Sequence, residues 1–211
     1  APYPEGFKTI KANDFEALET AFDDTTCALF IECIQGEGGV KLIDSQWAKA
    51  AAEAARKAGA IVMADEVQTG IGRTGTFLAS DALGFNPEVV TLAKGIAAGV
   101  PMGACLFRGK AADIFVAGDH QSTFAGNPLA CAAGNVVVKT VANQKFLNEV
   151  TQKGEYIKDT IKSWNIPFVK DIRGKGLMIG IQIEENIKPL DVEIKCLQEG
   201  LCVATAGSDV V

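Results

Sequence analysis

Two short uncharged runs, each ending abruptly in an ionisable side chain, constrain the fold of this 211-residue chain most strongly. The first is Ile61–Ala64, which is followed by Asp65, and the second is Val89–Ala93, which is followed by Lys94. Continuous apolar runs of this length, bounded by turn residues, are typical of strands that are covered on both faces of a parallel sheet. Ligands of open α/β sheets bind beyond the carboxyl ends of the strands, so Asp65 and Lys94 are predicted to face one ligand-binding edge.

An acid and an amine at such an edge are what a pyridoxal 5'-phosphate (PLP) site requires. The lysine amine forms a Schiff base with the cofactor, and the carboxylate pairs with the protonated pyridine nitrogen. Taken singly, Asp65 or Lys94 is typical of a solvated strand end. Their joint placement favours the cofactor interpretation.

The segment before Asp65 has the pattern of a βαβ unit. Cys27–Ile31 and Ala60–Ala64 are predicted strands, and between them lies an alanine-rich helix. Asp44 or Ser45 caps the start of this helix and Gly59 follows its end. The pattern predicts an α/β fold whose sheet is mostly parallel and flanked by helices. Further elements are predicted as helices at 14–22, 110–116 and 128–142, and as a strand at 104–107.

A domain boundary is predicted at Asn143-Gln144, which divides the chain into a large domain, residues 1–143, and a small domain, residues 144–211. Strands and helices alternate closely in this tail, which indicates part of a small α+β domain. Its predicted elements are a helix at 146–164, strands at 168–174 and 177–183, a helix at 189–199 and a strand at 201–205.

Gly70–Gly75 fits the G-x-G-x-x-G pattern of dinucleotide-binding proteins. In that motif the glycines lie directly between a strand and a helix, and the next strand ends in an acid. Here residues 65–69 intervene, and the next strand ends in Lys94. A nicotinamide site is therefore disfavoured.

Charge and hydropathy exclude two further classes. The formal net charge is −6 and no Lys/Arg cluster compensates for it, so no nucleic-acid partner is expected. No apolar run approaches the length that spans a bilayer, and Ala1–Gly6 resembles neither a signal peptide nor a transit peptide. The chain begins without Met, so it is expected to be a piece of a longer one.

The six cysteines form no CxxC pair, and His120 is the only histidine, so no metal site is expected. The cysteines are predicted to be small buried hydrophobes of a protein in the reducing cytoplasm. They are Cys27, Cys33, Cys105, Cys131, Cys196 and Cys202.

Four stretches, in order and spacing, resemble the class III, ornithine-type aminotransferases, which are PLP enzymes of fold type I. They are Ile31–Gly39, Ala64–Gly75, Thr91–Gly95 and Ser122–Ala130. The run Asp171–Gly180 looks most like the acetylornithine aminotransferases. The resemblance covers essentially all of the chain and implies a PLP-binding large domain.

By this resemblance, Lys94 is the lysine that binds the cofactor covalently and carries the proton in the transfer. Asp65 keeps the pyridine nitrogen protonated. Gln68 would donate a hydrogen bond to the phenolic oxygen of the cofactor, and Val67 would pack against one face of the ring.

Thr123, together with Ser122, would reach the cofactor phosphate of the neighbouring subunit, which implies a homodimer. Read from the residues alone, adjacent hydroxyls of this kind are more often plain turn residues. Glu37 matches the switch glutamate of the family, which frees an arginine for a second substrate carboxylate, and its alternative is an exposed loop acid. Glu32 is expected to support the substrate site and not to act as a catalyst.

The chain departs from the family pattern in several places. Cys33 stands where the family usually has proline, and Ala125 replaces a common glycine. The loop that cups the cofactor phosphate, the aromatic that stacks on the ring and the arginine that clamps the substrate carboxylate are expected in segments outside this chain.

The resemblance implies PLP-dependent transfer of an amino group from N-acetylornithine, or an ornithine-like ω-amine, to 2-oxoglutarate in arginine biosynthesis. Ornithine, succinylornithine and 4-aminobutyrate stay open as donors. The alternative is a non-catalytic fragment or pseudoenzyme that folds and dimerises without a complete active site.

Overall fold

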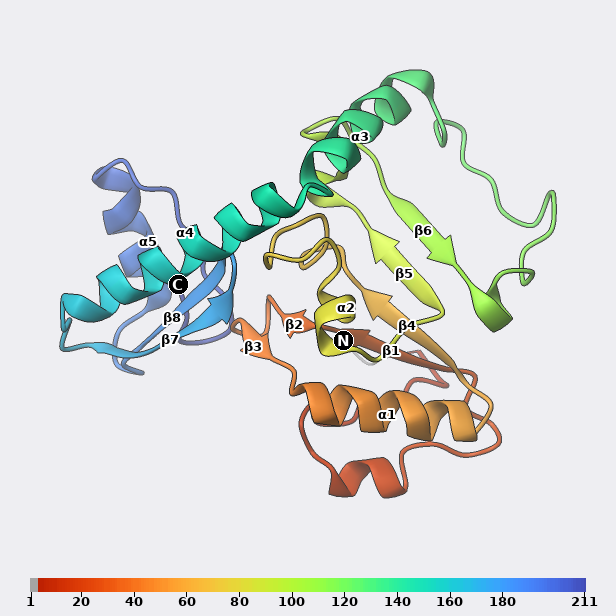
Figure 1. Cartoon of the computed structure of the whole chain (residues 1–211). Helices are drawn as coiled ribbons and strands as arrows, with labels where there is room; N and C mark the ends of the chain where they lie inside the picture. Colours follow the sequence, from red (N-terminus) through yellow and green to blue (C-terminus); the bar gives the residue numbers. More distant parts are fainter. Residues whose placement is uncertain (1–3) are drawn as a thin grey trace.

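The computed structural model describes residues 4–211, so residues 1–3 of the N-terminal segment assessed above lie outside it. A sheet of four strands in the order β1-β4-β5-β6 forms its centre (Figure 1). The strands β1 (Ala28–Glu32), β4 (Ile61–Asp65) and β5 (Val89–Leu92) are parallel. The edge strand β6 (Ala104–Phe107) pairs with β5 in the antiparallel sense. The predicted α/β class with a mostly parallel sheet is confirmed.

Helix α1 (Ser45–Lys57) covers one face of this sheet, as its alanines predict. Asp44 caps the helix, because its Oδ1 accepts hydrogen bonds from Gln46 N at 2.8 Å and Trp47 N at 2.9 Å. Gly59 follows the helix with φ +86°, which terminates it. The small buried side chains of α1 let it approach β1 and β4 closely, and together they form the main core.

The opposite face of the sheet is exposed at the edge strands β1 and β6 within residues 4–211, whereas the two predicted runs that form β4 and β5 contain no exposed residue. The pairing register places Phe30, Met63, Val89 and Phe107 in one row across it. Phe30 is 58% exposed and Phe107 is 37% exposed. The next row toward the carboxyl ends contains Glu32, Asp65, Thr91 and Cys105.

Two long helices lead from the sheet to the small domain. Helix α3 (Pro128–Val141) is capped by Asn127, whose Oδ1 accepts a hydrogen bond from Ala130 N at 2.9 Å. Helix α4 (Gln144–Ser163) is capped by Asn143. The predicted boundary falls in this short connection, and the division into two domains stays a prediction.

The part of the chain after residue 143 contains a hairpin packed against α4, with helix α5 (Pro189–Gln198) beside it (Figure 1). Its strands β7 (Val169–Lys175) and β8 (Met178–Ile183) are antiparallel. The predicted strand at 201–205 is wrong. The edge of β8 pairs instead with the last residues of the chain, because Ile181 and Val211 exchange two backbone hydrogen bonds at 2.8 Å and 3.0 Å.

Several short elements differ from the sequence prediction. The helices expected at 14–22 and 110–116 are single 3₁₀ turns, η1 (Glu16–Glu19) and η3 (Gly109–Ala111). The Asp14 carbonyl accepts a hydrogen bond from Trp47 Nε1 at 2.9 Å. This bond joins the start of η1 to α1, and the carbonyl does not take part in a longer helix. Helix α2 (Ala79–Leu83) was not predicted.

The glycines of the G-x-G-x-x-G stretch serve close packing. A methyl group on Gly72 would lie 2.5 Å from Val141 Cγ1, and one on Gly75 would lie 2.2 Å from Thr151 Oγ1. These glycines therefore let the loop approach α3 and α4. The tip of the β7–β8 hairpin joins the same loop, since Leu177 N donates to the Arg73 carbonyl at 2.9 Å.

The cysteine prediction is correct in part. All six are free, but only Cys33 is buried, while Cys27, Cys105 and Cys202 are exposed and Cys131 and Cys196 are intermediate. Cys105 lies on the edge strand β6, and Cys27 and Cys202 lie in connections, where no second layer covers them. None of the helices within residues 4–211 combines the length and hydropathy needed to cross a membrane.

Candidate active site

Lys94 follows β5 on a strained turn. It begins the 3₁₀ element η2 (Lys94–Ala97) and has φ +49°, a left-handed conformation that is uncommon outside glycine. The turn is held by its neighbours, because Ile96 N donates to the Ala93 carbonyl at 3.1 Å and both Ile96 and Ala97 are buried. Such a conformation persists only where the surroundings impose it, and it is typical of functional sites.

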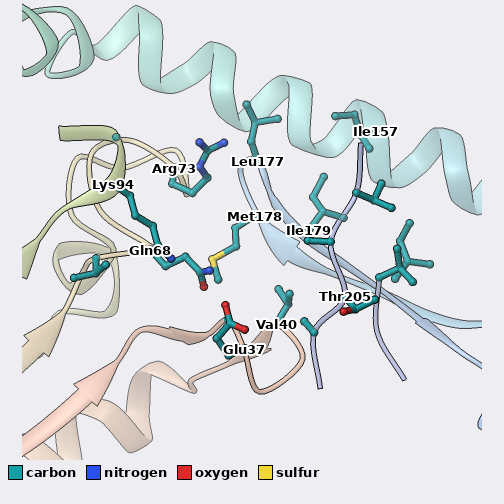
Figure 2. A pocket seen from close by; sticks show the side chains of 18 of the residues that line it. Glu37, Val40, Gln68, Arg73, Lys94, Ile157, Leu177, Met178, Ile179 and Thr205 are labelled. Atoms are coloured by element: carbon teal, nitrogen blue, oxygen red, sulfur yellow. The ribbon is translucent and has the colours of Figure 1, made fainter. Parts of the chain in front are cut away.

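The Lys94 side chain enters a cavity of about 600 Å³ between the carboxyl edge of the sheet and the β7–β8 hairpin. Figure 2 shows Lys94 and Glu37 reaching into this cavity from different segments, with the Gln68 amide between them. The wall on the small-domain side is apolar and includes Met178 and Ile179. Val67 also lines the cavity, so the structure brings together Lys94, Gln68, Val67 and Glu37.

Asp65 lies at the end of β4, paired in register with Thr91 of β5, but it lines a separate, smaller hollow of about 160 Å³. Glu32 lines the same hollow. Asp65 Oδ1 accepts a hydrogen bond from Val67 N at 2.9 Å, so the carboxylate is tied to the loop that reaches the Lys94 cavity. The two hollows are thus neighbours on one sheet edge, and the pairing of Asp65 and Lys94 on one cofactor stays a prediction.

The charges of Asp65 and Lys94 both act on the pKa of Glu32. Burial raises the pKa of Glu32 above its ordinary value of 4.5, the Gly36 N–H opposes this, and the negative charge of Asp65 raises the pKa further. The positive charge of Lys94 lowers the pKa of Glu32 and the negative charge of Glu37 raises it. The predicted site acids and the amine therefore share one electrostatic environment.

Glu32→Gln is expected to make the chain more stable at neutral pH. Because the pKa of Glu32 is raised in the folded chain, the native state holds this proton to higher pH than the unfolded state. Stability is therefore lost as pH rises above 4.5 through the folded pKa, and glutamine removes that loss. Urea unfolding at about pH 4 and about pH 7 measures this, and the gain should be present only at the higher pH. Glu53→Gln, at an exposed acid on α1, is the control, and an equal gain there would contradict the prediction.

Ser122 and Thr123 lie in the exposed connection between η3 and α3 and do not line the Lys94 cavity. The structure therefore does not bring them to Lys94 within one chain. Their predicted role at a neighbouring subunit stays a prediction.

The loop that carries Glu37 is held from both sides. Gly39 N and Val40 N both donate to the Gly36 carbonyl, at 3.0 Å and 3.1 Å, and Gly207 N donates to the Glu37 carbonyl at 2.9 Å. The Glu37 side chain itself is exposed toward the cavity. Its position is thus set by its backbone.

Glu66 is a site-supporting residue that the sequence prediction missed. It is 1% exposed, and its carboxylate accepts hydrogen bonds from Thr69 Oγ1 at 2.5 Å, Ala79 N at 3.1 Å and Ser80 N at 2.7 Å. The Cys33 thiol lies 3.8 Å from Glu66 Oε1, and burial, with the nearby Glu66 charge, raises the pKa of Cys33 so that it stays protonated.

The signal for Glu66 was present in the sequence. Successive side chains of a strand point to opposite faces, so of two adjacent acids after a strand only one can face the site. Asp65 faces the hollow that Glu32 also lines, and Glu66 turns inward to anchor the 66–69 loop.

Comparison with known proteins shows the family of this chain. The model of the class-III aminotransferase family matches residues 2–211. Acetylornithine aminotransferase from Haemophilus ducreyi is 42% identical over 206 residues, which are 97% of this chain and 52% of that protein. Acetylornithine aminotransferase from Caldanaerobacter subterraneus is 40% identical over 212 residues, 100% of this chain and 53% of that protein.

Solved structures give the same result. Ornithine aminotransferase from Toxoplasma gondii, which has PLP at partial occupancy in its active site, superposes with a TM-score of 0.91 at 34% identity, covering 100% of this chain and 51% of that one. N-acetylornithine aminotransferase from Stenotrophomonas maltophilia gives a TM-score of 0.89 at 32% identity, covering 100% and 56%. The chain spans about half the length of the curated relatives it matches. On sequence and fold together, the chain belongs to the class-III aminotransferases.

Proposed function

We propose that this chain carries the cofactor-binding lysine of a PLP-dependent enzyme that transfers an amino group from N-acetylornithine to 2-oxoglutarate in arginine biosynthesis. The observation that carries the proposal is Lys94, held on a strained turn with its amine in a cavity beside Gln68 and Glu37. The identity of about 40% to acetylornithine aminotransferases supports the choice of donor and favours an enzyme over a non-catalytic fragment.

The residues present fit PLP, because one sheet edge offers a primary amine, a carboxylate and an amide from neighbouring segments. When bound, PLP supplies an aldehyde for the amine and an electron-accepting ring. Lys94 Nζ would hold the aldehyde end and carry a proton from the carbon that bears the amino group of the donor. Asp65, oriented by its hydrogen bond from Val67 N, would stabilise a positive ring nitrogen.

Gln68 and Val67 would orient the ring, and Glu37 and Glu32 would act on the substrate. Glu37 is suited to this role because it lines the same cavity as Lys94 and Gln68 (Figure 2). A homodimer, with Thr123 and Ser122 reaching the partner's cofactor, and a cytoplasmic location complete the proposal. The exposed position of these hydroxyls leaves them free to reach a second chain.

Addition of PLP tests the proposal directly. A visible absorbance band that borohydride bleaches, with the label found on Lys94 by peptide mass, is expected. Turnover of N-acetylornithine with 2-oxoglutarate, compared with ornithine, succinylornithine and 4-aminobutyrate, then tests the donor. A band without turnover would favour the non-catalytic alternative, and no band would overturn the proposal for this chain.

Gly36→Ala is expected to weaken PLP binding by about tenfold, which is the loss of roughly one hydrogen bond. A methyl group at Gly36 would lie 1.4 Å from Gln68 Oε1 and 2.5 Å from Gln68 Cδ, so the Gln68 side chain has to leave its place in the cavity. Titration of the absorbance band measures the affinity. Gly103→Ala, where the new methyl meets only the Leu92 carbonyl at 3.5 Å, is the matched control. Equal affinities of the two variants would mean that Gln68 does not hold the cofactor.

A further inference from the structure

Arg173 of β7 reaches across from the small domain and holds the loop that carries Glu37. Its Nη2 donates to the Gly39 carbonyl at 2.6 Å, and its Nε donates to the carbonyls of Gly39 and Val40, each at 3.1 Å. Charged donors on backbone carbonyls make strong hydrogen bonds. One side chain thus fixes two consecutive peptide groups at the end of the loop.

The guanidinium is itself fixed by its own domain. Nη1 donates to Asp171 Oδ2 at 2.9 Å and to Gln182 Oε1 at 2.8 Å, and Gln182 Nε2 donates to Asp209 Oδ2 at 2.6 Å. The Arg173 side chain is 17% exposed. These contacts orient the guanidinium before it meets the loop, so the loop position follows that of the β7–β8 hairpin.

The backbone of the loop is strained at Val40. It has φ +50°, a strained conformation for a β-branched residue, yet its side chain is buried in a cluster with Ile34, Met178 and Val210. A methyl group on Gly180 would lie 2.8 Å from Val40 Cβ, so the glycine makes room for Val40 in the hairpin. Packing and the Arg173 hydrogen bonds together hold Val40 in this strained conformation.

We propose that Arg173 is a positioning residue that sets the place of Glu37 in the Lys94 cavity through the 36–40 loop. The place of Glu37 then follows the position of the β7–β8 hairpin. The inference rests on the proposed function only in assigning substrate recognition to Glu37. The hydrogen bonds by which Arg173 holds residues 39 and 40, called the clamp below, are independent of that function.

Arg173→Met keeps an unbranched side-chain stem and removes all of the hydrogen-bond donors of the guanidinium. Hydrogen exchange of the Gly39 and Val40 amides, which donate to the Gly36 carbonyl, is expected to become about tenfold faster or more. Lys170→Met, on the same strand but paired with Glu184 at the surface, is the control and should leave this exchange unchanged. Unchanged exchange in Arg173→Met would overturn the clamp.

Steady-state kinetics of the PLP-loaded enzyme test the link to Glu37. Arg173→Met should raise KM for the substrates by about tenfold while kcat changes less, and it should have no further effect in a Glu37→Gln background. Equal effects with and without Glu37 would overturn the positioning role. If Glu37→Gln alone leaves KM unchanged, the assignment of Glu37 fails while the exchange experiment still decides the clamp. Arg173→Lys, which keeps the charge beside Asp171 but offers no fork of donors, should change exchange in the same direction and serves if Arg173→Met does not fold.

Discussion

Lys94→Ala is expected to abolish covalent attachment of PLP and to lower kcat by about 10³-fold or more, since a positioned acid–base group alone contributes about 10²–10⁴-fold. The proposed chemistry needs one amine that both holds the aldehyde and carries the proton. Within residues 4–211, Lys94 is the lysine that lines the cavity with Gln68 and Glu37. The borohydride-fixed label and the transamination rate measure the two roles separately.

Lys57→Ala is the matched control, because Lys57 lies on the exposed face of α1, where it pairs with Glu53 at 2.9 Å. It should retain the label and the rate. Transamination by Lys94→Ala at the unsubstituted rate would refute the proposed function, whatever the label shows. Added alkylamine offers a second check, since a small free amine should restore part of the proton transfer if the alanine variant is otherwise intact.

The arrangement of the sheet could be predicted because its signals are local. The runs that end in Asp65 and Lys94 form parallel neighbours β4 and β5, and the Asp44 cap and Gly59 bound α1 as expected. Short elements were less predictable. Residues 14–22 have helical periodicity but form only a 3₁₀ turn, and the Asp14 carbonyl accepts a hydrogen bond from Trp47 of α1. Tertiary contacts of this kind leave no local pattern in the sequence.

The site was predictable to the extent that it depends on strand ends. Lys94, Gln68, Val67 and Glu37 meet in one cavity, as the sheet edge and the resemblance suggested. The contact between Arg173 and Gly39 joins residues 134 positions apart. No periodicity or spacing in the sequence predicts such a pair. The prediction that the cysteines are buried failed for a similar reason. Whether other residues cover a strand or a connection depends on segments that are distant in the sequence.

Glu66→Ala is expected to lower the free energy of unfolding by at least about 3 kcal/mol, because each buried donor left without a partner costs roughly 1–3 kcal/mol. The Glu66 carboxylate holds two backbone N–H groups, of Ala79 and Ser80, and the Thr69 hydroxyl. Glu66→Gln keeps one acceptor oxygen but turns an amide N–H₂ toward these donors, so a smaller loss in the same direction is expected. Urea unfolding measures both.

The same substitution should also reach the site, because Glu66 lies between Asp65 and the Val67–Gln68 pair. With its anchor gone, the 65–69 loop loses the contact that holds it against α2, and PLP affinity is expected to fall along with stability. Glu53→Ala, which removes an exposed acid paired with Lys57, is expected to cost less than about 1 kcal/mol and to leave PLP affinity unchanged. A Glu66→Ala chain as stable as Glu53→Ala would show that the α2 amides find other partners. If Glu66→Ala is destabilised but binds PLP with normal affinity, Glu66 has a structural role only. The position of Gln68 would then depend on the space at Gly36 and not on Glu66.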